Sequence, residues 1–236
     1  MRITSVNVAR YRMPKAGAQA GGYGGEIQIV DIETDVGVTG RCFVSTTAPA
    51  GPVLCAMLEN LLAPIVIGED PRETARLWDR MYADAIPRRG GDGLMRFAIA
   101  AIDFALWDIR AKAADAPVWK LLGGGRDLIP TYANCAHHLP PDALAARAAE
   151  DVAAGHKALK IRGTRTFVTP EVATERVRQV REAIGPDIRL MVDVNGSWDV
   201  DTAIQQLKIW EKHDVYWLEE PVPPQDMPGD PRIRAR

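Results

Sequence analysis

The sequence has few cysteines, almost no net charge and no long apolar run, and each of these features excludes a class of protein. Three cysteines in 236 residues are too few and too widely spaced for a disulfide scaffold or a zinc motif. A formal net charge of −2 offers no basic surface for nucleic acid or for an anionic membrane. No segment reaches the roughly 18 apolar residues of a membrane span, and the N-terminus shows no signal peptide. We therefore expect a reduced, cytoplasmic protein that binds neither nucleic acid nor a membrane.

The composition that remains is that of an ordinary globular protein. Hydrophobic residues make up 47% of the chain and charged residues 25%, which argues against disorder. At roughly 100–200 residues per domain, a chain of 236 residues forms one large domain or two modest ones. A change of pattern near residue 128 favours two, an α+β domain over 1–127 and a β/α domain over 128–236.

The N-terminal part begins with β-rich segments and continues with helices. Residues 3–12, 27–34 and 38–44 are rich in β-branched side chains, and the turn at 35–37 predicts a hairpin between the last two. Helices are expected over 51–62, from Asp70-Pro71 onwards, and from a cap at Asp92 to a stop at Pro117. These elements predict a small antiparallel meander followed by helices, which together form an α+β unit.

From residue 129, short β-rich runs alternate with amphipathic helices. Strands are expected over 129–135, 158–162, 188–194 and 215–219, with helices over 142–154, 171–184 and 200–212 between them. Asp199 is expected to cap the third of these helices. This repeat predicts a parallel sheet with right-handed crossovers. Four such units make half of a (β/α)₈ barrel or a small doubly wound sheet. The proline-rich segment after Glu220 predicts a loop.

Polar residues stand where these predicted strands end, which is the end at which parallel β/α sheets carry their sites. Taken singly, each of them also fits a solvated rim, a turn, a helix cap or a strand exit. Their occurrence at the same end of consecutive strands favours a site. Two of them are carboxylates on adjacent strands, as a Mg²⁺ site requires, and a lysine beside a metal either stabilises an anion or acts as a base. In chain order these residues are His137, Lys160, Arg162, Asp193, Asn195, Glu219 and Glu220.

Several motifs in this order resemble the enolase superfamily, most closely the mandelate racemase/muconate lactonizing enzyme family and its acid-sugar dehydratase branch. The motifs lie at 100–109, 118–124, 160–162, 193–195 and 217–221. The resemblance implies an N-terminal α+β capping domain followed by a partial (β/α) barrel of about four of the eight units. It also implies Mg²⁺ as cofactor, a sugar acid as the small-molecule substrate, and removal of the proton α to its carboxylate through an enediolate.

The resemblance also implies roles for individual residues. Asp193 and Glu219 would bind the metal, with Glu220 supporting them from outside. Lys160 and Arg162 would be the catalytic pair. Substrate would be contacted by Asn195, Tyr23 and His137, the tyrosine from a cap loop at 21–25 that works with a second loop at 45–51.

One departure from the family concerns Arg162, which stands where relatives often carry a lysine base. The pKa of an arginine lies above about 12, so Arg162 is better suited to an electrostatic clamp, with Lys160 pairing with the substrate carboxylate. The base would then be a histidine on a later strand. Chemistry with a single base favours a dehydratase over a racemase.

A second departure concerns length. A barrel takes about 250 residues, many more than 129–236 supply, so the third metal carboxylate and the histidine base are expected to be absent from this chain. We expect a truncated, split or incompletely represented enzyme. The alternative hypothesis is an inactive remnant, or a half-barrel that acts only by assembly with another chain. The open sheet edge favours a homo-oligomer.

Overall fold

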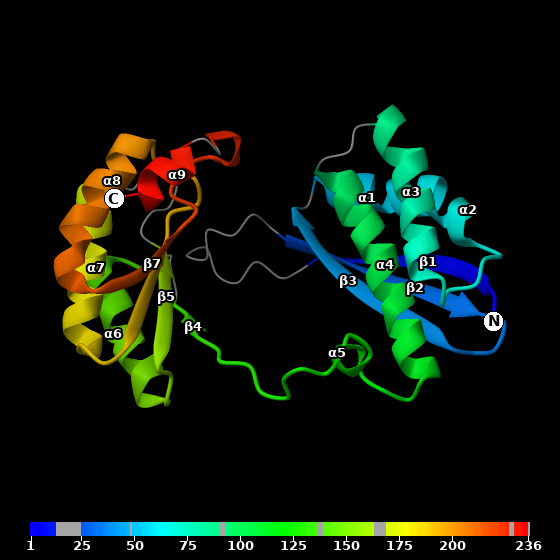
Figure 1. Cartoon of the computed structure of the whole chain (residues 1–236), viewed down its shortest axis with the longest axis horizontal. Coiled ribbons are helices and arrows are strands. Elements are labelled where there is room, and N and C mark those ends of the chain that lie inside the picture. Colours follow the sequence, from blue (N-terminus) through cyan, green and yellow to red (C-terminus); the bar gives the residue numbers. More distant parts are fainter. Residues whose placement is uncertain are drawn as a thin grey trace. The chain divides into compact units, whose positions relative to one another are not determined.

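The computed structural model describes residues 1–12, 25–47, 49–89, 93–135, 139–162, 169–226 and 229–235. The chain forms two compact units, Met1–Asp127 and Leu128–Arg236. Each unit has its own sheet and its own buried apolar core (Figure 1). No helix in the described part of the chain is both long enough and apolar enough to cross a bilayer.

The sheet of the first unit is the antiparallel meander that the sequence predicts. It consists of β1 (Ile3–Arg12), β2 (Gly25–Thr34) and β3 (Thr39–Thr47), in that order. Every second residue of β2 from Glu26 to Thr34 is buried, so one face of the strand is turned to the interior. The predicted hairpin turn contains Gly37, whose φ of +79° is easily adopted only by glycine.

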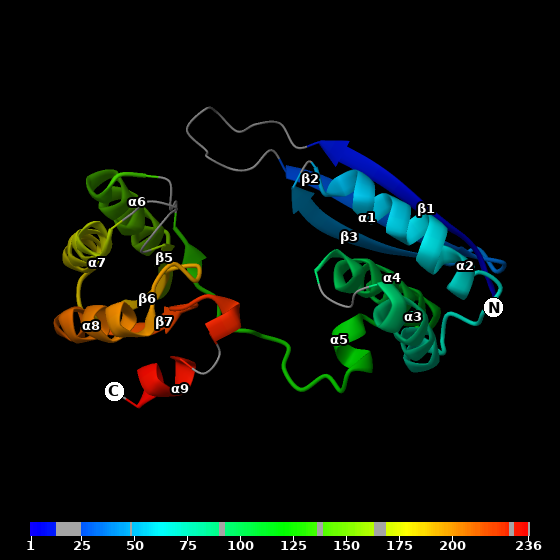
Figure 2. The ribbon, with the colours of Figure 1, turned by 90° about the horizontal axis from the view of Figure 1, so that it is seen from above.

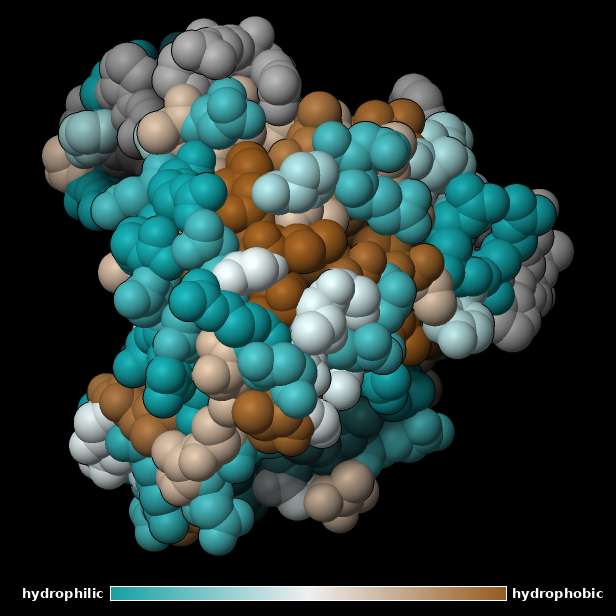
Figure 3. All heavy atoms as spheres, turned by 90° about the vertical axis from the view of Figure 1, so that its right-hand side faces the viewer, coloured by the Kyte–Doolittle hydropathy of each residue, from teal (hydrophilic) through white to brown (hydrophobic). Residues whose placement is uncertain are grey.

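The helices of the first unit are α1 (Gly51–Met57), α3 (Thr74–Arg89), α4 (Leu94–Ala113) and α5 (Val118–Leu121). A π-helical segment, η1 (Leu58–Leu62), joins α1 to α2 (Ala63–Val66). α4 lies along β3 and beside α3 (Figures 1 and 2). Hydrophobic side chains also reach the surface of the face shown in Figure 3, where they gather in the centre among hydrophilic ones.

The starts of α3 and α4 bear on two predictions from the sequence. α3 begins at Thr74, so the prediction that Asp70-Pro71 opens the helix is wrong. The carboxylate of Asp70 instead accepts hydrogen bonds from the backbone and the side chain of Arg72, which closes a turn before the helix. Asp92, the predicted cap of α4, lies outside the described residues, and the N-cap position is held by Gly93.

The second unit contains a four-stranded parallel sheet in the order β4-β5-β6-β7. Its strands are β4 (Ala133–Asn134), β5 (Ala158–Arg162), β6 (Arg189–Asp193) and β7 (Val215–Glu219). Three helices lie on one side of the sheet (Figure 2), namely α6 (Pro141–Ala153), α7 (Pro170–Ile184) and α8 (Val200–Trp210), the last continued by η2 (Glu211–His213). Thr169 and Asp199 cap α7 and α8 through their side-chain oxygens, the second as predicted.

Two predicted elements of this unit differ from the structure. The strand expected over 129–135 is only two residues long, because only Ala133 and Asn134 pair with β5, and the side chain of Ile129 is 67% exposed. The segment after Glu220 is not all loop, since it contains η3 (Pro224–Asp226) and α9 (Gly229–Arg234). Pro231 is tolerated in α9 because it stands in the first turn, where its missing N–H would have no partner within the helix.

Candidate active site

The predicted site residues of the parallel sheet lie at the carboxyl ends of adjacent strands. Arg162, Asp193 and Glu219 end β5, β6 and β7, and they are direct partners in the pairing register. Paired residues of neighbouring strands point to the same face of a sheet. Lys160, two residues earlier, shares that face, which is opposite to the helices that cover Leu159 and Ile161.

Lys160 connects the two carboxylates. Its Nζ donates a hydrogen bond to Glu219 Oε1 at 2.8 Å and lies 3.6 Å from Asp193 Oδ2. Burial lowers the pKa of Lys160, but the hydrogen bond to Glu219 and the charges of both carboxylates outweigh it, so the pKa is raised overall. The side chain is therefore a protonated donor, suited to holding an anion.

The carboxylate of Asp193 is held through one of its two oxygens. Its Oδ1 accepts hydrogen bonds from the backbone N–H of Asn195 at 2.9 Å and from the side-chain amide of Asn195 at 2.8 Å. Asn195 has a φ of +49°, a left-handed conformation that asparagine tolerates better than most residues. The other oxygen, Oδ2, faces Lys160 and lies 3.8 Å from Arg162 Nη2. The two oxygens of Asp193 thus have different surroundings, one bound by Asn195 and the other facing two positive charges.

Backbone hydrogen bonds tie the segment after β6 to the segment after β7. The N–H of Val194 donates to the carbonyl of Glu219 at 3.1 Å, and the N–H of Gly196 donates to the carbonyl of Glu220 at 2.7 Å. Glu220 has an exposed side chain and a φ of +47°. Its structural contribution near the site comes from its backbone, while the predicted support by its carboxylate stays a prediction.

A bulge in β7 lets Val215 face the helices while Glu219 lies on the same face as Asp193. Leu190 pairs with Val215 and Met191 pairs with Trp217, so Tyr216 is an extra residue in the strand. Val215 accordingly packs against the core under the helices, while Trp217 and Glu219 lie on the opposite face. The bulge allows an apolar residue and a carboxylate to point in opposite directions although they are four residues apart.

Two aromatic side chains that the sequence did not single out border the site. The rings of Tyr132 and Trp217 meet edge to face with centroids 5.9 Å apart, and Lys160 Nζ lies 5.7 Å from the centroid of the Tyr132 ring. Trp217 stands two positions before Glu219, and this alternation along the strand was the available signal for its place beside the site.

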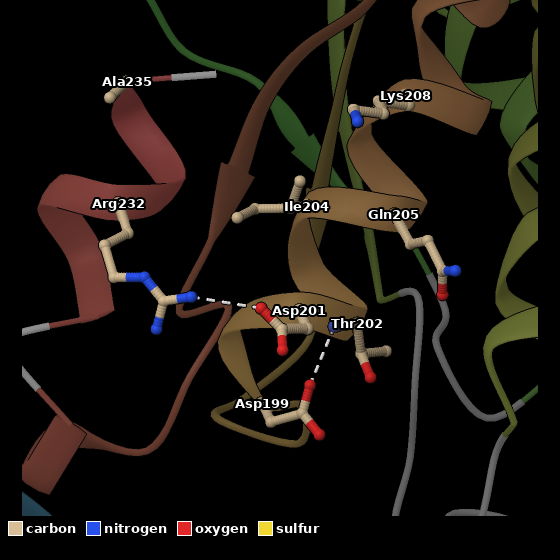
Figure 4. Close-up of a pocket in the computed structure, with 8 residues that line it drawn as sticks. All are labelled: Asp199, Asp201, Thr202, Ile204, Gln205, Lys208, Arg232 and Ala235. Carbon is tan, nitrogen blue, oxygen red and sulfur yellow. Dashed lines mark hydrogen bonds and ion pairs between the residues drawn. The ribbon is translucent and has the colours of Figure 1, made fainter.

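The remaining predicted site residues, Tyr23 and His137, lie outside the described residues, so their roles in binding substrate stay predictions. A separate groove of about 590 Å³ runs between α8 and α9 (Figure 4), where Arg232 pairs with Asp201 at 3.2 Å. None of the predicted site residues lines this groove. Among the residues that the structure describes, no group of three or more His, Cys, Asp or Glu side chains is placed to hold a metal.

Two protein-family models match the chain, one in each unit. The model of the mandelate racemase/muconate lactonizing enzyme N-terminal domain matches residues 2–123, and that of the enolase C-terminal domain-like family matches residues 143–236. The chain belongs to the mandelate racemase/muconate lactonizing enzyme family. This confirms the resemblance to the enolase superfamily and the expected fold class, a capping domain with a partial barrel.

Among curated proteins of this family, several act on sugar acids according to their names. A 3,6-anhydro-α-L-galactonate cycloisomerase from Streptomyces coelicolor is 34% identical over 209 residues, which are 88% of this chain and 57% of that protein. A D-galactonate dehydratase from Klebsiella pneumoniae is 35% identical over 220 residues, covering 87% of this chain and 54% of that protein. The chain therefore spans about half the length of the curated relatives that it matches. Dehydratases were expected, whereas cycloisomerases were not.

Solved structures of this family agree. A racemase from Streptomyces coelicolor with bound magnesium superimposes with a TM-score of 0.89 at 31% identity, covering 98% of this chain and 66% of that chain. A mandelate racemase/muconate lactonizing enzyme from Polaromonas gives a TM-score of 0.87 at 33% identity, with 100% of this chain and 64% of that chain covered. The expected homo-oligomer stays a prediction.

Proposed function

We propose that this chain carries the first part of the active site of a Mg²⁺-dependent sugar-acid dehydratase. Asp193 and Glu219 would hold the metal, while Lys160 and Arg162 would bind the carboxylate of the substrate. The observation that carries the proposal is the register of β6 and β7, which pairs Asp193 with Glu219 at the carboxyl ends of the strands. The names of several relatives, which are galactonate and arabinonate dehydratases, support a sugar acid as substrate.

The donor set suits Mg²⁺. The ion prefers oxygen ligands, commonly takes one or two protein carboxylates, and keeps water or substrate oxygens in its other positions. Asp193 offers its Oδ2, since its Oδ1 is already engaged by Asn195. When bound, Mg²⁺ would stabilise the negative charge that develops on the substrate carboxylate as the α proton leaves.

The side chains of this chain would bind and orient the substrate. The planar guanidinium of Arg162 is suited to two parallel hydrogen bonds with a carboxylate, and the Lys160 ammonium provides a compact positive charge beside it. Neither acts as the base in this proposal, since a guanidinium is a poor base and Lys160 Nζ is engaged by Glu219. The α proton therefore passes to a group outside this pair.

Overall, dehydration removes one water molecule from the substrate. The C–H bond at the α carbon breaks and its proton goes to the base, while the hydroxyl of the neighbouring carbon leaves with a proton from an acid. The resulting enol becomes an α-keto acid. A single base on one face of the substrate is sufficient for this reaction, whereas racemisation needs a proton donor on the other face as well.

The proposal is tested by titrating Mg²⁺ into the chain by calorimetry, and then D-galactonate or arabinonate into the chain with Mg²⁺ present. Asp193→Asn and Glu219→Gln should each remove Mg²⁺ binding while leaving the circular dichroism spectrum unchanged. Asp201→Asn serves as the matched control, because Asp201 pairs with Arg232 and lies outside the site. Unchanged Mg²⁺ affinity in both site variants would refute the assignment of the ligands.

A further inference from the structure

Helix α7 carries two arginines whose guanidinium groups bind backbone carbonyls at different ends of the sheet. Arg176, buried in α7, donates from Nε to the carbonyl of Arg162 at 3.1 Å and from Nη1 to the carbonyl of Leu139 at 2.7 Å. Arg181, one and a half turns later, donates at 2.7–2.9 Å to the carbonyls of Gly185, Ile188, His213 and Asp214.

The carbonyls bound by these two arginines lie at opposite ends of the strands. Arg162 is the last residue of β5, and Leu139 lies in the segment between β4 and α6. The partners of Arg181 instead precede β6 and β7. Helical side chains lean toward the N-terminus of their helix, and the N-terminus of α7 follows β5, so Arg176 reaches the end of the sheet that carries the site.

We propose that Arg176 is a positioning residue of the site, which fixes the carboxyl end of β5 and thereby the directions in which Lys160 and Arg162 are presented to a carboxylate. Arg176 holds the backbone of Arg162 itself, and it holds the chain after β4 at the same time. The fork geometry of a guanidinium suits this task, because its donors are fixed in one plane and diverge toward two acceptors. The consequence for ligand binding rests on the proposed function, whereas the positioning of β5 does not.

Arg181 provides a matched control. It has the same chemistry, lies on the same helix and also binds backbone carbonyls, but at the other end of the sheet. If Arg176 contributed only to the overall stability of the unit, Arg176→Lys and Arg181→Lys would both speed amide exchange at both ends of the sheet. A positioning role predicts that the two variants loosen different parts of the sheet.

The first experiment measures amide hydrogen exchange by NMR in the whole chain. Near the site, the amide of Cys135 donates to the carbonyl of Lys160 at 2.9 Å and that of Leu144 donates to Pro140 at 2.9 Å. At the other end, the amide of Arg189 donates to Lys157 and that of Asp214 donates to Glu211, both at 3.2 Å. Arg176→Lys should speed exchange of the first pair about tenfold or more and leave the second pair unchanged. Arg181→Lys should do the reverse.

Equal acceleration of both pairs in Arg176→Lys, or no acceleration of the first pair, would overturn the proposal. If Arg176→Lys does not fold, Arg176→Gln replaces it, since a neutral amide still donates without burying a charge.

The second experiment measures binding of D-galactonate in the presence of Mg²⁺ by calorimetry. Arg176→Lys should weaken binding on the order of tenfold, as is typical for residues that support a site from outside, while Arg181→Lys should stay within about twofold of the unsubstituted chain. Equal weakening in both variants would count against the positioning role. If the unsubstituted chain does not bind D-galactonate, the proposed function fails for this ligand, and the exchange experiment still decides the role of Arg176.

Discussion

The ammonium of Lys160 donates a hydrogen bond to Glu219 at 2.8 Å, although the two residues are 59 positions apart and β6 runs between their strands. The lysine reaches across the middle strand and passes Asp193 at 3.6 Å. It therefore places a positive charge beside both carboxylates that we assign to the metal. We therefore expect the Lys160 ammonium to repel a divalent cation bound by Asp193 and Glu219.

Replacing Lys160 by methionine should tighten Mg²⁺ binding by at least about tenfold, because removing one of two like charges a few ångströms apart relieves repulsion even at high effective dielectric. Calorimetric titration with MgCl₂ measures the change. Lys157→Met, which removes an exposed lysine from the preceding segment, is the control and should leave the affinity unchanged. Weaker Mg²⁺ binding in Lys160→Met would show that the lysine supports the metal.

Substitutions of Asn195 should separate its side chain from its backbone conformation. Asn195→Gly keeps the left-handed φ accessible but loses the amide that donates to Asp193, and we expect about a tenfold loss in Mg²⁺ affinity. Asn195→Ala should lose the same affinity and, in addition, about 1 kcal/mol of the free energy of unfolding, since alanine disfavours the left-handed region. Mg²⁺ affinity equal to that of the unsubstituted chain in Asn195→Gly would exclude a role for the amide.

In the first unit, Gly40→Ala should be strongly destabilising. A Cβ at this position of β3 would lie 2.0 Å from the carbonyl oxygen of Ala105 and 2.6 Å from Ile109 Cγ1, both on α4. We expect a loss of about 3 kcal/mol in the free energy of unfolding, the upper part of the range for overpacking. Chemical denaturation measures it, with Gly125→Ala as the control, because no atom lies within 4 Å of a Cβ there. Equal stability of the two variants would mean that α4 can move away from β3.

His213 should make the second unit sensitive to mild acid. Burial, with smaller contributions from neighbouring charges, lowers the pKa of His213 below its usual 6.5, and among the described residues its Nε2 has no hydrogen-bond partner. Because protonation is easier in the unfolded chain, the free energy of unfolding should be unaffected well above pH 6.5 and should fall as the pH drops through that value.

Thermal unfolding between pH 7.5 and 5.5 checks this expectation. His213→Gln should reduce the loss of melting temperature over this range, whereas replacement of the exposed His156 by glutamine should not. An identical pH dependence in His213→Gln and the unsubstituted chain would contradict it.

The second unit was predictable from sequence wherever a local rule and the packing agreed. β5 and β7 have the predicted bounds, and Asp199 caps α8 as expected, because alternation and capping act over a few residues. β4 was predicted too long, since the extent of an edge strand depends on how many of its residues find partners on β5.

The candidate site was predictable only in part for a similar reason. The motifs and the predicted strand ends placed Lys160, Arg162, Asp193 and Glu219 at the carboxyl edge of the sheet. The register confirms that the last three lie side by side. The sequence could not indicate that Lys160 would pair with Glu219 across β6, or that Tyr132 would meet Trp217. Those contacts depend on the curvature of the sheet and on side-chain conformations, which no local pattern encodes.

The extra residue at Tyr216 makes the length of β7 separable from the direction of its last side chain. Because Val215 already faces the helices and Trp217 already faces the site, the strand could lose that one residue and still turn Glu219 toward Asp193. The chain between α8 and Glu219 would then be one residue shorter, with both carboxylates still on the same face of the sheet.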